Sequence, residues 1–112
     1  MSKCLISNPH GCPITHTMNI IGNKWTPIII YALGEKKLRF GEIAVRIAGI
    51  SRKVLTEQLK MLELRGIINR QAYAEIPPRV EYSLTQKGRE ILPILDQLCH
   101  WSRDIMVEEE RL

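Results

Sequence analysis

The sequence lacks any apolar segment long enough to cross a lipid bilayer. Its longest apolar run covers only residues 28–33, whereas a membrane-spanning helix needs about 20 such residues. The first four residues, MSKC, also lack the apolar core of a secretory signal peptide. We therefore expect a cytoplasmic protein with no membrane partner.

Cysteine is scarce and its number is odd: the chain holds Cys4, Cys12 and Cys99. Without a secretory signal, this count predicts free thiols rather than a structural disulfide framework. Cys4, His10, Cys12 and His16 are potential metal ligands, but their spacing matches no regular zinc module. We expect neither a metal nor a cofactor.

The length of 112 residues leaves room for one domain and none for a separate catalytic domain. Hydrophobic residues make up 45% and charged residues 25%, as in an ordinary soluble globular protein. A cysteine–histidine hydrolase would also need an orienting group and an oxyanion site, and no motif supplies them. The sequence therefore predicts a protein that is not an enzyme.

Positive charge is concentrated in the middle of the chain. The formal net charge is +4, and five of the twelve acidic residues lie after residue 95. Between residues 35 and 70, nine basic side chains face four acidic ones. A polyanion is the natural partner of such a segment.

Hydrophobic periodicity and capping residues predict a mainly helical chain. Helices are expected over 13–21, 23–34, 40–47 and 51–65, and a further helix is expected from Thr85 onward. Pro93 lies inside that last pattern, so we expect a kink or a late start near Leu92. Strands are expected at 67–73 and 80–84, with a short one at 36–39.

This order predicts a winged helix-turn-helix, a mainly α fold with a small β-hairpin (α+β). The third and fourth helices are separated by a short link, residues 48–50, that contains a glycine, and a hairpin follows the fourth helix directly. We expect a flexible arm over 1–12, the winged domain with its dimerisation helices over 13–106, and a frayed acidic tail over 107–112.

The fourth helix is the predicted DNA-reading element. On a helical wheel its leucines gather on one side, which leaves a polar, basic face on the other. Because the N-terminal side chains of such a helix reach base edges in the major groove, the candidates for base contact are Ser51, Arg52, Lys53 and Thr56, with Lys60 on phosphate. The alternative is an ordinary solvated face, but the neighbouring helix, the hairpin and the local charge favour DNA.

The hairpin adds Arg70 on its first strand and Arg79 near its tip. These side chains either contact phosphate and the minor groove or belong to an ordinary charged hairpin. The sequence leaves both interpretations open.

Cys12 stands directly before Pro13, at the expected start of the first helix. A thiolate at this position would be stabilised by the helix dipole, and His10 and His16 are near in sequence, so a lowered pKa and reactivity are one interpretation. An unreactive, half-buried thiol is the other. Cys4 is a candidate to pair with Cys12 or with a second subunit, and Cys99 is expected to pack.

The last helix carries an apolar sector that covers about half of its circumference, more than a helix needs to cover a small core. Part of this sector therefore requires another partner.

The sequence resembles the HxlR-type winged-helix transcriptional regulators from Cys12 to about Trp101. The resemblance rests on the succession of several motifs, none of which is specific alone: CP at 12–13, GNKW at 22–25, LRFGEI at 38–43, GISRKVLT at 49–56, LKMLE at 59–63, GIINR at 66–70 and PPRVEYSLT at 77–85.

The resemblance implies a homodimer, joined through its terminal helices, that binds an inverted-repeat operator in double-stranded DNA. It assigns dimerisation to Ile14 and Met18 in the first helix and to Ile91, Leu95, Leu98, Trp101 and Ile105 in the last. Several members of that family sense quinones, aldehydes or oxidants through a cysteine at the position of Cys12. The effector is left open. The alternative function is a winged-helix protein-interaction module that reads no DNA, and a thiol enzyme is a weaker rival.

Overall fold

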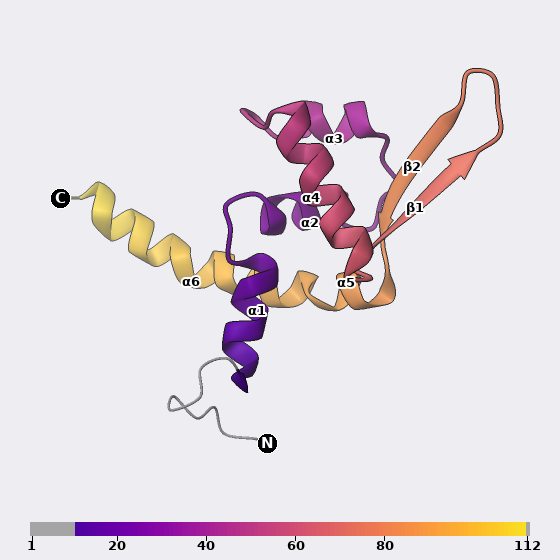
Figure 1. The fold of residues 1–112 in the computed structure, drawn as a ribbon. Helices are drawn as coiled ribbons and strands as arrows, with labels where there is room; N and C mark the ends of the chain where they lie inside the picture. Colours follow the sequence, from indigo (N-terminus) through magenta and orange to yellow (C-terminus); the bar gives the residue numbers. More distant parts are fainter. Residues whose placement is uncertain (1–10, 112) are drawn as a thin grey trace.

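The computed structural model describes residues 11–111 of the chain. Most of the expected arm, with Cys4 and His10, lies outside these residues. The elements are, in chain order, α1 (Pro13–Ile21), α2 (Thr26–Leu33), α3 (Phe40–Arg46), α4 (Arg52–Leu64), β1 (Ile68–Tyr73), β2 (Arg79–Leu84), α5 (Gln86–Glu90) and α6 (Leu92–Glu110) (Figure 1).

Helix α1 begins where the sequence predicts, with Cys12 as its N-cap residue and Pro13 in the first turn. Asn23, the predicted cap residue of the second helix, is not its N-cap residue, because α2 begins later, at Thr26. The Asn23 side chain instead accepts hydrogen bonds from the backbone N–H groups of Trp25 and Thr26, at 2.9 and 3.0 Å. Asn23 therefore shapes the turn before α2, while Trp25 occupies the cap position.

The helix-turn-helix consists of α3 and α4. Its link is longer than predicted because α3 ends at Arg46, and Gly49 provides a positive φ of 85° within it. Ser51 caps α4 as expected: its Oγ accepts a hydrogen bond of 3.1 Å from the backbone N–H of Val54. The helix ends before Gly66, whose φ is 74°.

Strands β1 and β2 form the antiparallel hairpin, with Ile68 opposite Leu84 and Tyr73 opposite Arg79. Arg79 thus belongs to β2 rather than to the predicted connecting loop. The predicted strand at 36–39 is reduced to one bridge, in which Leu38 and Tyr82 exchange backbone hydrogen bonds of 2.9 and 2.8 Å.

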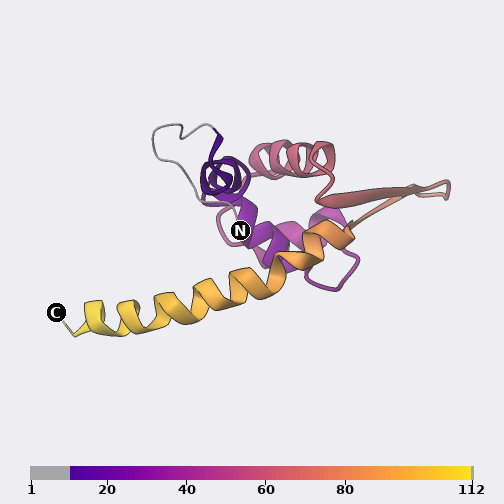
Figure 2. The same ribbon diagram turned by 90° about the horizontal axis from the view of Figure 1, so that it is seen from below.

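The last predicted helix is two helices. Thr85 caps α5 by accepting a hydrogen bond from the N–H of Gly88, and α6 starts at Leu92 with Pro93 in its first turn, as predicted. The C-terminal part of α6 extends away from the other elements, in the direction opposite to the hairpin (Figures 1 and 2). Residues 108–110 continue α6 and are exposed, so the predicted frayed tail is helical.

The core forms around α2, which packs against α1, α3, β2 and α6. Apolar side chains of α2, α3, α4 and both strands are fully buried in it: Ile29, Ile30, Leu33, Ile43, Leu55, Leu62, Ile68 and Leu84. Burial of one such side chain contributes about 1.5–3 kcal/mol. The predicted fold class is confirmed: the chain is a winged helix-turn-helix, and its core fixes α4 and the hairpin side by side.

Candidate nucleic-acid interface

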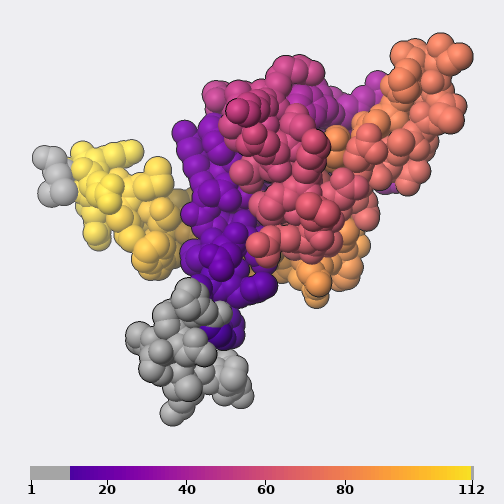
Figure 3. Space-filling model, in the orientation of Figure 1, coloured from indigo at the N-terminus to yellow at the C-terminus, as the bar shows by residue number. Residues whose placement is uncertain are grey.

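Helix α4 turns one face to the core and leaves the other open. Leu55, Leu59 and Leu62 are buried, as the helical pattern predicts. The opposite face lies on the surface beside the hairpin (Figure 3). All five predicted DNA-contacting residues are exposed: Lys53, Thr56 and Lys60 lie on this face beside Glu57, Arg52 lies at its border, and Ser51 is the N-cap residue.

Two hydroxyl groups on this face already have partners in the helix itself. Ser51 Oγ accepts the capping bond, and Thr56 Oγ1 donates a hydrogen bond of 2.7 Å to the carbonyl of Arg52. These bonds orient the hydroxyl oxygens along the backbone. The long cationic side chains of Arg52, Lys53 and Lys60 therefore provide the main outward-reaching groups.

Arg52 is positioned by α3. Its guanidinium lies 4.9 Å from the centroid of the Phe40 ring, a cation–π distance. Since Phe40 begins α3, this contact ties the first residue of α4 to the helix before it. The charge of Arg52 is thereby held at the corner of the helix-turn-helix.

A groove of about 370 Å³ separates α4 from the base of the hairpin. Thr56 and Lys60 line it from α4, and Arg70 lines it from β1. The fold thus brings together three of the predicted residues, from two elements, around one depression. Lys60 and Arg70 give this depression two cationic groups suited to phosphate, against the single carboxylate of Glu63.

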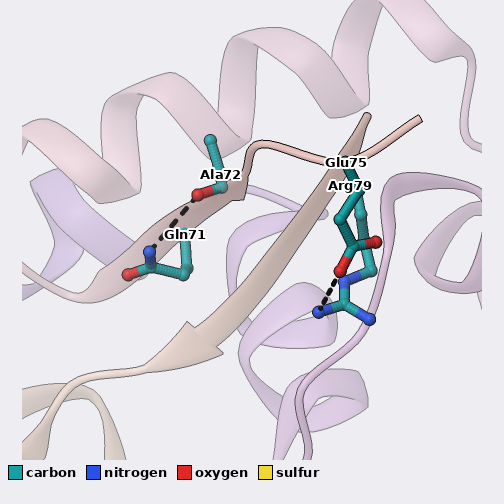
Figure 4. A network of polar contacts seen from close by, with 4 residues as sticks. All are labelled: Gln71, Ala72, Glu75 and Arg79. Carbon is teal, nitrogen blue, oxygen red and sulfur yellow. Dashed lines mark hydrogen bonds and ion pairs between the residues drawn. The ribbon is translucent and has the colours of Figure 1, made fainter. Parts of the chain in front are cut away.

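Arg79 is held within the hairpin. Its guanidinium forms an ion pair of 3.2 Å with Glu75 (Figure 4) and lies 4.1 Å from the centroid of the Tyr73 ring. Its Nε is buried and has no hydrogen-bond partner among residues 11–111. Arg79 is therefore less available than an arginine on an open loop, and its charge is offset by a carboxylate.

A buried polar chain that the sequence did not reveal connects α2 to α4. Thr26, whose exposed fraction is zero, donates a hydrogen bond of 2.6 Å to Gln58 Oε1. The same hydroxyl accepts a bond of 2.7 Å from Asn23 Nδ2. Because buried polar groups are costly unless they are paired, this chain fixes the position of α4 against α2.

The sequence reasoning also missed a second depression, on the other side of β1. It has a volume of about 570 Å³, and its walls include Lys36, Lys37, Arg70 and Arg89 together with Glu81. Arg89 is engaged in the fold, since it donates a hydrogen bond of 2.9 Å to the carbonyl of Leu84. The sequence signal for this depression was the pair of adjacent lysines, Lys36 and Lys37, which directly precede Leu38 and its bridge to the hairpin.

Comparison with known proteins agrees with this geometry. The model of the HxlR-like helix-turn-helix family matches residues 20–110. The chain belongs to this family. An uncharacterised HTH-type transcriptional regulator of Methanothermobacter thermautotrophicus is 48% identical over 92 residues, which cover 82% of this chain and 70% of the relative. The HxlR-like chain is accordingly a DNA-binding regulator of transcription.

Two regulators of known structure share the fold. The reduced form of the redox regulator HypR has a TM-score of 0.82 and 38% identity, and the match covers 89% of this chain and 99% of HypR. The reduced form of the transcriptional regulator YodB from Bacillus subtilis has a TM-score of 0.73 and 36% identity, over 81% and 90% of the two chains. HypR is also known in an oxidised form and YodB in a diamide-treated form.

Cys12 of this HxlR-like chain lies at the N-terminus of α1, as predicted. It is only 6% exposed, and it takes part in a disulfide bond. The expectation of free thiols is therefore wrong for Cys12, for which the sequence had also left a disulfide open, whereas Cys99 is a free, half-buried thiol on α6. His16, one turn after Cys12, is exposed.

Helices α1 and α6 carry exposed apolar side chains. The predicted dimerisation residues Ile14, Met18, Leu98 and Trp101 are 64%, 51%, 48% and 68% exposed. Ile91 and Ile105 are half-buried. Leu95 is 6% exposed and belongs to the core of its own chain, so it is not an open interface residue. Ile94, Met106 and Val107 add to the exposed set.

A polar cluster borders this apolar surface. The Tyr31 hydroxyl on α2 donates a hydrogen bond of 3.3 Å to Asp96, and His100 Nε2 lies 3.8 Å from the same carboxylate. The negative charge of Asp96 raises the pKa of Tyr31 above its usual value, because it disfavours the phenolate. Tyr31 is thus a neutral hydrogen-bond donor at physiological pH.

Within the part of the chain that the structure describes, no three His, Cys, Asp or Glu side chains are grouped to hold a metal ion. Nor is any helix in residues 11–111 long and apolar enough to span a membrane.

Proposed function

We propose that the protein is a cytoplasmic homodimer that regulates transcription by binding an inverted-repeat operator. In each half-site, α4 enters the major groove. The observation that carries the proposal is the exposed cationic face of α4, continued by Arg70 across the groove at the base of the hairpin. A helix about 10–12 Å in diameter fits the major groove, which is about 12 Å wide.

Each predicted side chain then has a role. Arg52, Lys53 and Thr56 lie in the first turns of α4, where side chains reach base edges, and Ser51 orients the helix through its cap. Lys60 and Arg70 contact the phosphates that flank the groove. Arg79 contributes to the hairpin mainly through its pairing with Glu75 and Tyr73.

Selection of binding sites from random DNA tests this function. We expect a palindromic sequence whose half-sites are about 34 Å apart, one helical turn of DNA. The affinity should also fall steeply with salt, because each neutralised phosphate adds about 0.9 to the slope of log K against log salt. Enrichment of no sequence would favour the alternative, a winged-helix protein-interaction module.

We also propose that Cys12 makes this regulator responsive to oxidants. The support is its position at the start of α1, its disulfide bond and the redox forms of the related HypR and YodB. In the switch, two thiols lose two protons and two electrons to the oxidant, and one S–S bond forms. Diamide, as the oxidant, accepts both protons and both electrons and becomes a hydrazine.

The substitution Cys12→Ser tests this switch. Serine is a favourable N-cap residue, so α1 should be preserved while the sulfur is removed. We expect the variant to bind the operator as the reduced protein does and to lose the change in affinity caused by diamide, measured by fluorescence anisotropy. Cys99→Ser is the matched control and should keep the response. A diamide response that persists in Cys12→Ser would refute the role of Cys12.

A further inference from the structure

An apolar pocket of about 280 Å³ lies where α1, α2, α5 and the junction of α4 with β1 meet. It is separate from both depressions beside the hairpin. Its walls are formed by five isoleucines, one or two from each neighbouring element: Ile20, Ile21, Ile30, Ile67 and Ile91.

The polar side chains that line this isoleucine pocket include one ammonium group. Lys87 on α5 and His16 on α1, both exposed, line it together with Thr17, whose hydroxyl donates a hydrogen bond of 2.9 Å to the carbonyl of Pro13. Among the described residues that line the pocket, none is acidic. An apolar cavity with few polar groups of one kind is the usual form of a small-molecule site, and here the charge selects an anion.

We propose that the isoleucine pocket binds a small aromatic carboxylic acid. The ring would occupy the apolar part and the carboxylate would pair with the ammonium group of Lys87. Sites for drug-sized ligands have volumes of about 300–1,000 Å³, so a pocket of about 280 Å³, just below this range, suits a single substituted ring. A charge-assisted bond between ammonium and carboxylate then distinguishes the acid from its neutral analogues.

The position of the pocket provides a path to the DNA-binding surface. Ile67 follows α4, and its carbonyl accepts a hydrogen bond of 3.0 Å from the N–H of Thr85. The Thr85 hydroxyl is shared between the carbonyls of Gly66 and Ile67, at 2.7 and 3.0 Å. Gly88 packs so closely that a Cβ placed on it would be 2.3 Å from the same carbonyl. The end of α4 and α5 are therefore in direct contact. A ligand that separates α1 from α5 would displace the end of α4. The resulting change in operator affinity rests on the proposed function, whereas binding of the ligand does not.

Isothermal titration of the full-length protein with 4-isopropylbenzoate tests the site, with 4-isopropylbenzamide as the neutral probe. We expect saturable binding of the benzoate and at least tenfold weaker binding of the benzamide. Lys87→Met, which keeps the length of the side chain and removes its charge, should weaken benzoate binding at least tenfold. Lys37→Met removes an exposed charge elsewhere and should change nothing.

A second variant, Ile20→Phe, fills the pocket and should abolish binding of both probes. Its fold is checked by circular dichroism, and Lys87→Met decides the question if Ile20→Phe does not fold. Absence of saturable benzoate binding, as expected if a second copy of the chain occupied the pocket, would overturn the proposal. So would equal benzoate affinity in the wild type and Lys87→Met. Neither result depends on DNA, so they are distinct from a failure of the proposed regulator function.

Discussion

The double substitution Arg52→Ala and Lys53→Ala is expected to abolish specific retention of the operator in a gel-shift assay. Both side chains are exposed in the first turn of α4. A bidentate contact to a base contributes about 1–3 kcal/mol of discrimination, so loss of two contacts corresponds to a decrease in affinity of about a hundredfold or more. Alanine also has the highest helix propensity, so α4 should remain intact.

The matched control is Arg103→Ala with Arg111→Ala. It removes an equal number of positive charges from exposed positions at the other end of the molecule, on and after α6. If the charge of the whole protein determined binding, both double variants would lose affinity equally. Retention of the operator by the Arg52/Lys53 variant, with its melting temperature unchanged, would show that α4 does not read the DNA.

The parts of the fold that the sequence predicts are those set by local chemistry. The cap at Ser51, the spacing of three leucines and the left-handed Gly66 define α4, because each acts within one or two turns of its own helix. Pro93 likewise placed the start of α6, since proline is tolerated only in the first turn of a helix.

Contacts between distant segments account for the elements whose observed bounds differ from the predicted ones. The strand predicted at 36–39 becomes a single bridge because only Leu38 pairs with Tyr82. The start of α2 is delayed because Asn23 bonds to the turn and to Thr26, which in turn bonds to Gln58 on α4. No local pattern reports a partner that lies 32 positions away.

The candidate site likewise contains some features that local sequence patterns predict and others that depend on contacts between distant segments. Exposure of Arg52, Lys53, Thr56 and Lys60 follows from the helical wheel, and the sequence predicted it. The convergence of Lys60 and Arg70 on one groove depends on how the hairpin packs beside α4, and hydrophobic periodicity does not predict that packing. The ion pair of Arg79 depends on the shape of the hairpin tip, where Glu75 faces it.

Helix α6 leaves several apolar side chains exposed. Leu98 and Trp101 are three positions apart, so they lie on one side of the helix, and they are 48% and 68% exposed. Burial of each would contribute about 1.5–3 kcal/mol, and a two-fold axis would bury each of them twice. Contiguous exposed apolar groups are typical of protein interfaces, and the proposed dimer would cover these side chains.

The double substitution Leu98→Glu and Trp101→Glu is therefore expected to give a monomer of 12.9 kDa by analytical ultracentrifugation, where the wild type sediments as a dimer. Operator affinity should fall at least a hundredfold, because the second half-site is no longer bound by a linked partner at an effective concentration of about 1 mM. Leu64→Glu, at a position 89% exposed near the end of α4, is the control and should remain dimeric. A wild-type protein that sediments as a monomer at high concentration would refute the dimer, and a double variant that stays dimeric would place the interface elsewhere. In the first case, α4 would have to bind a single half-site, and the operator selected from random DNA would lose its symmetry.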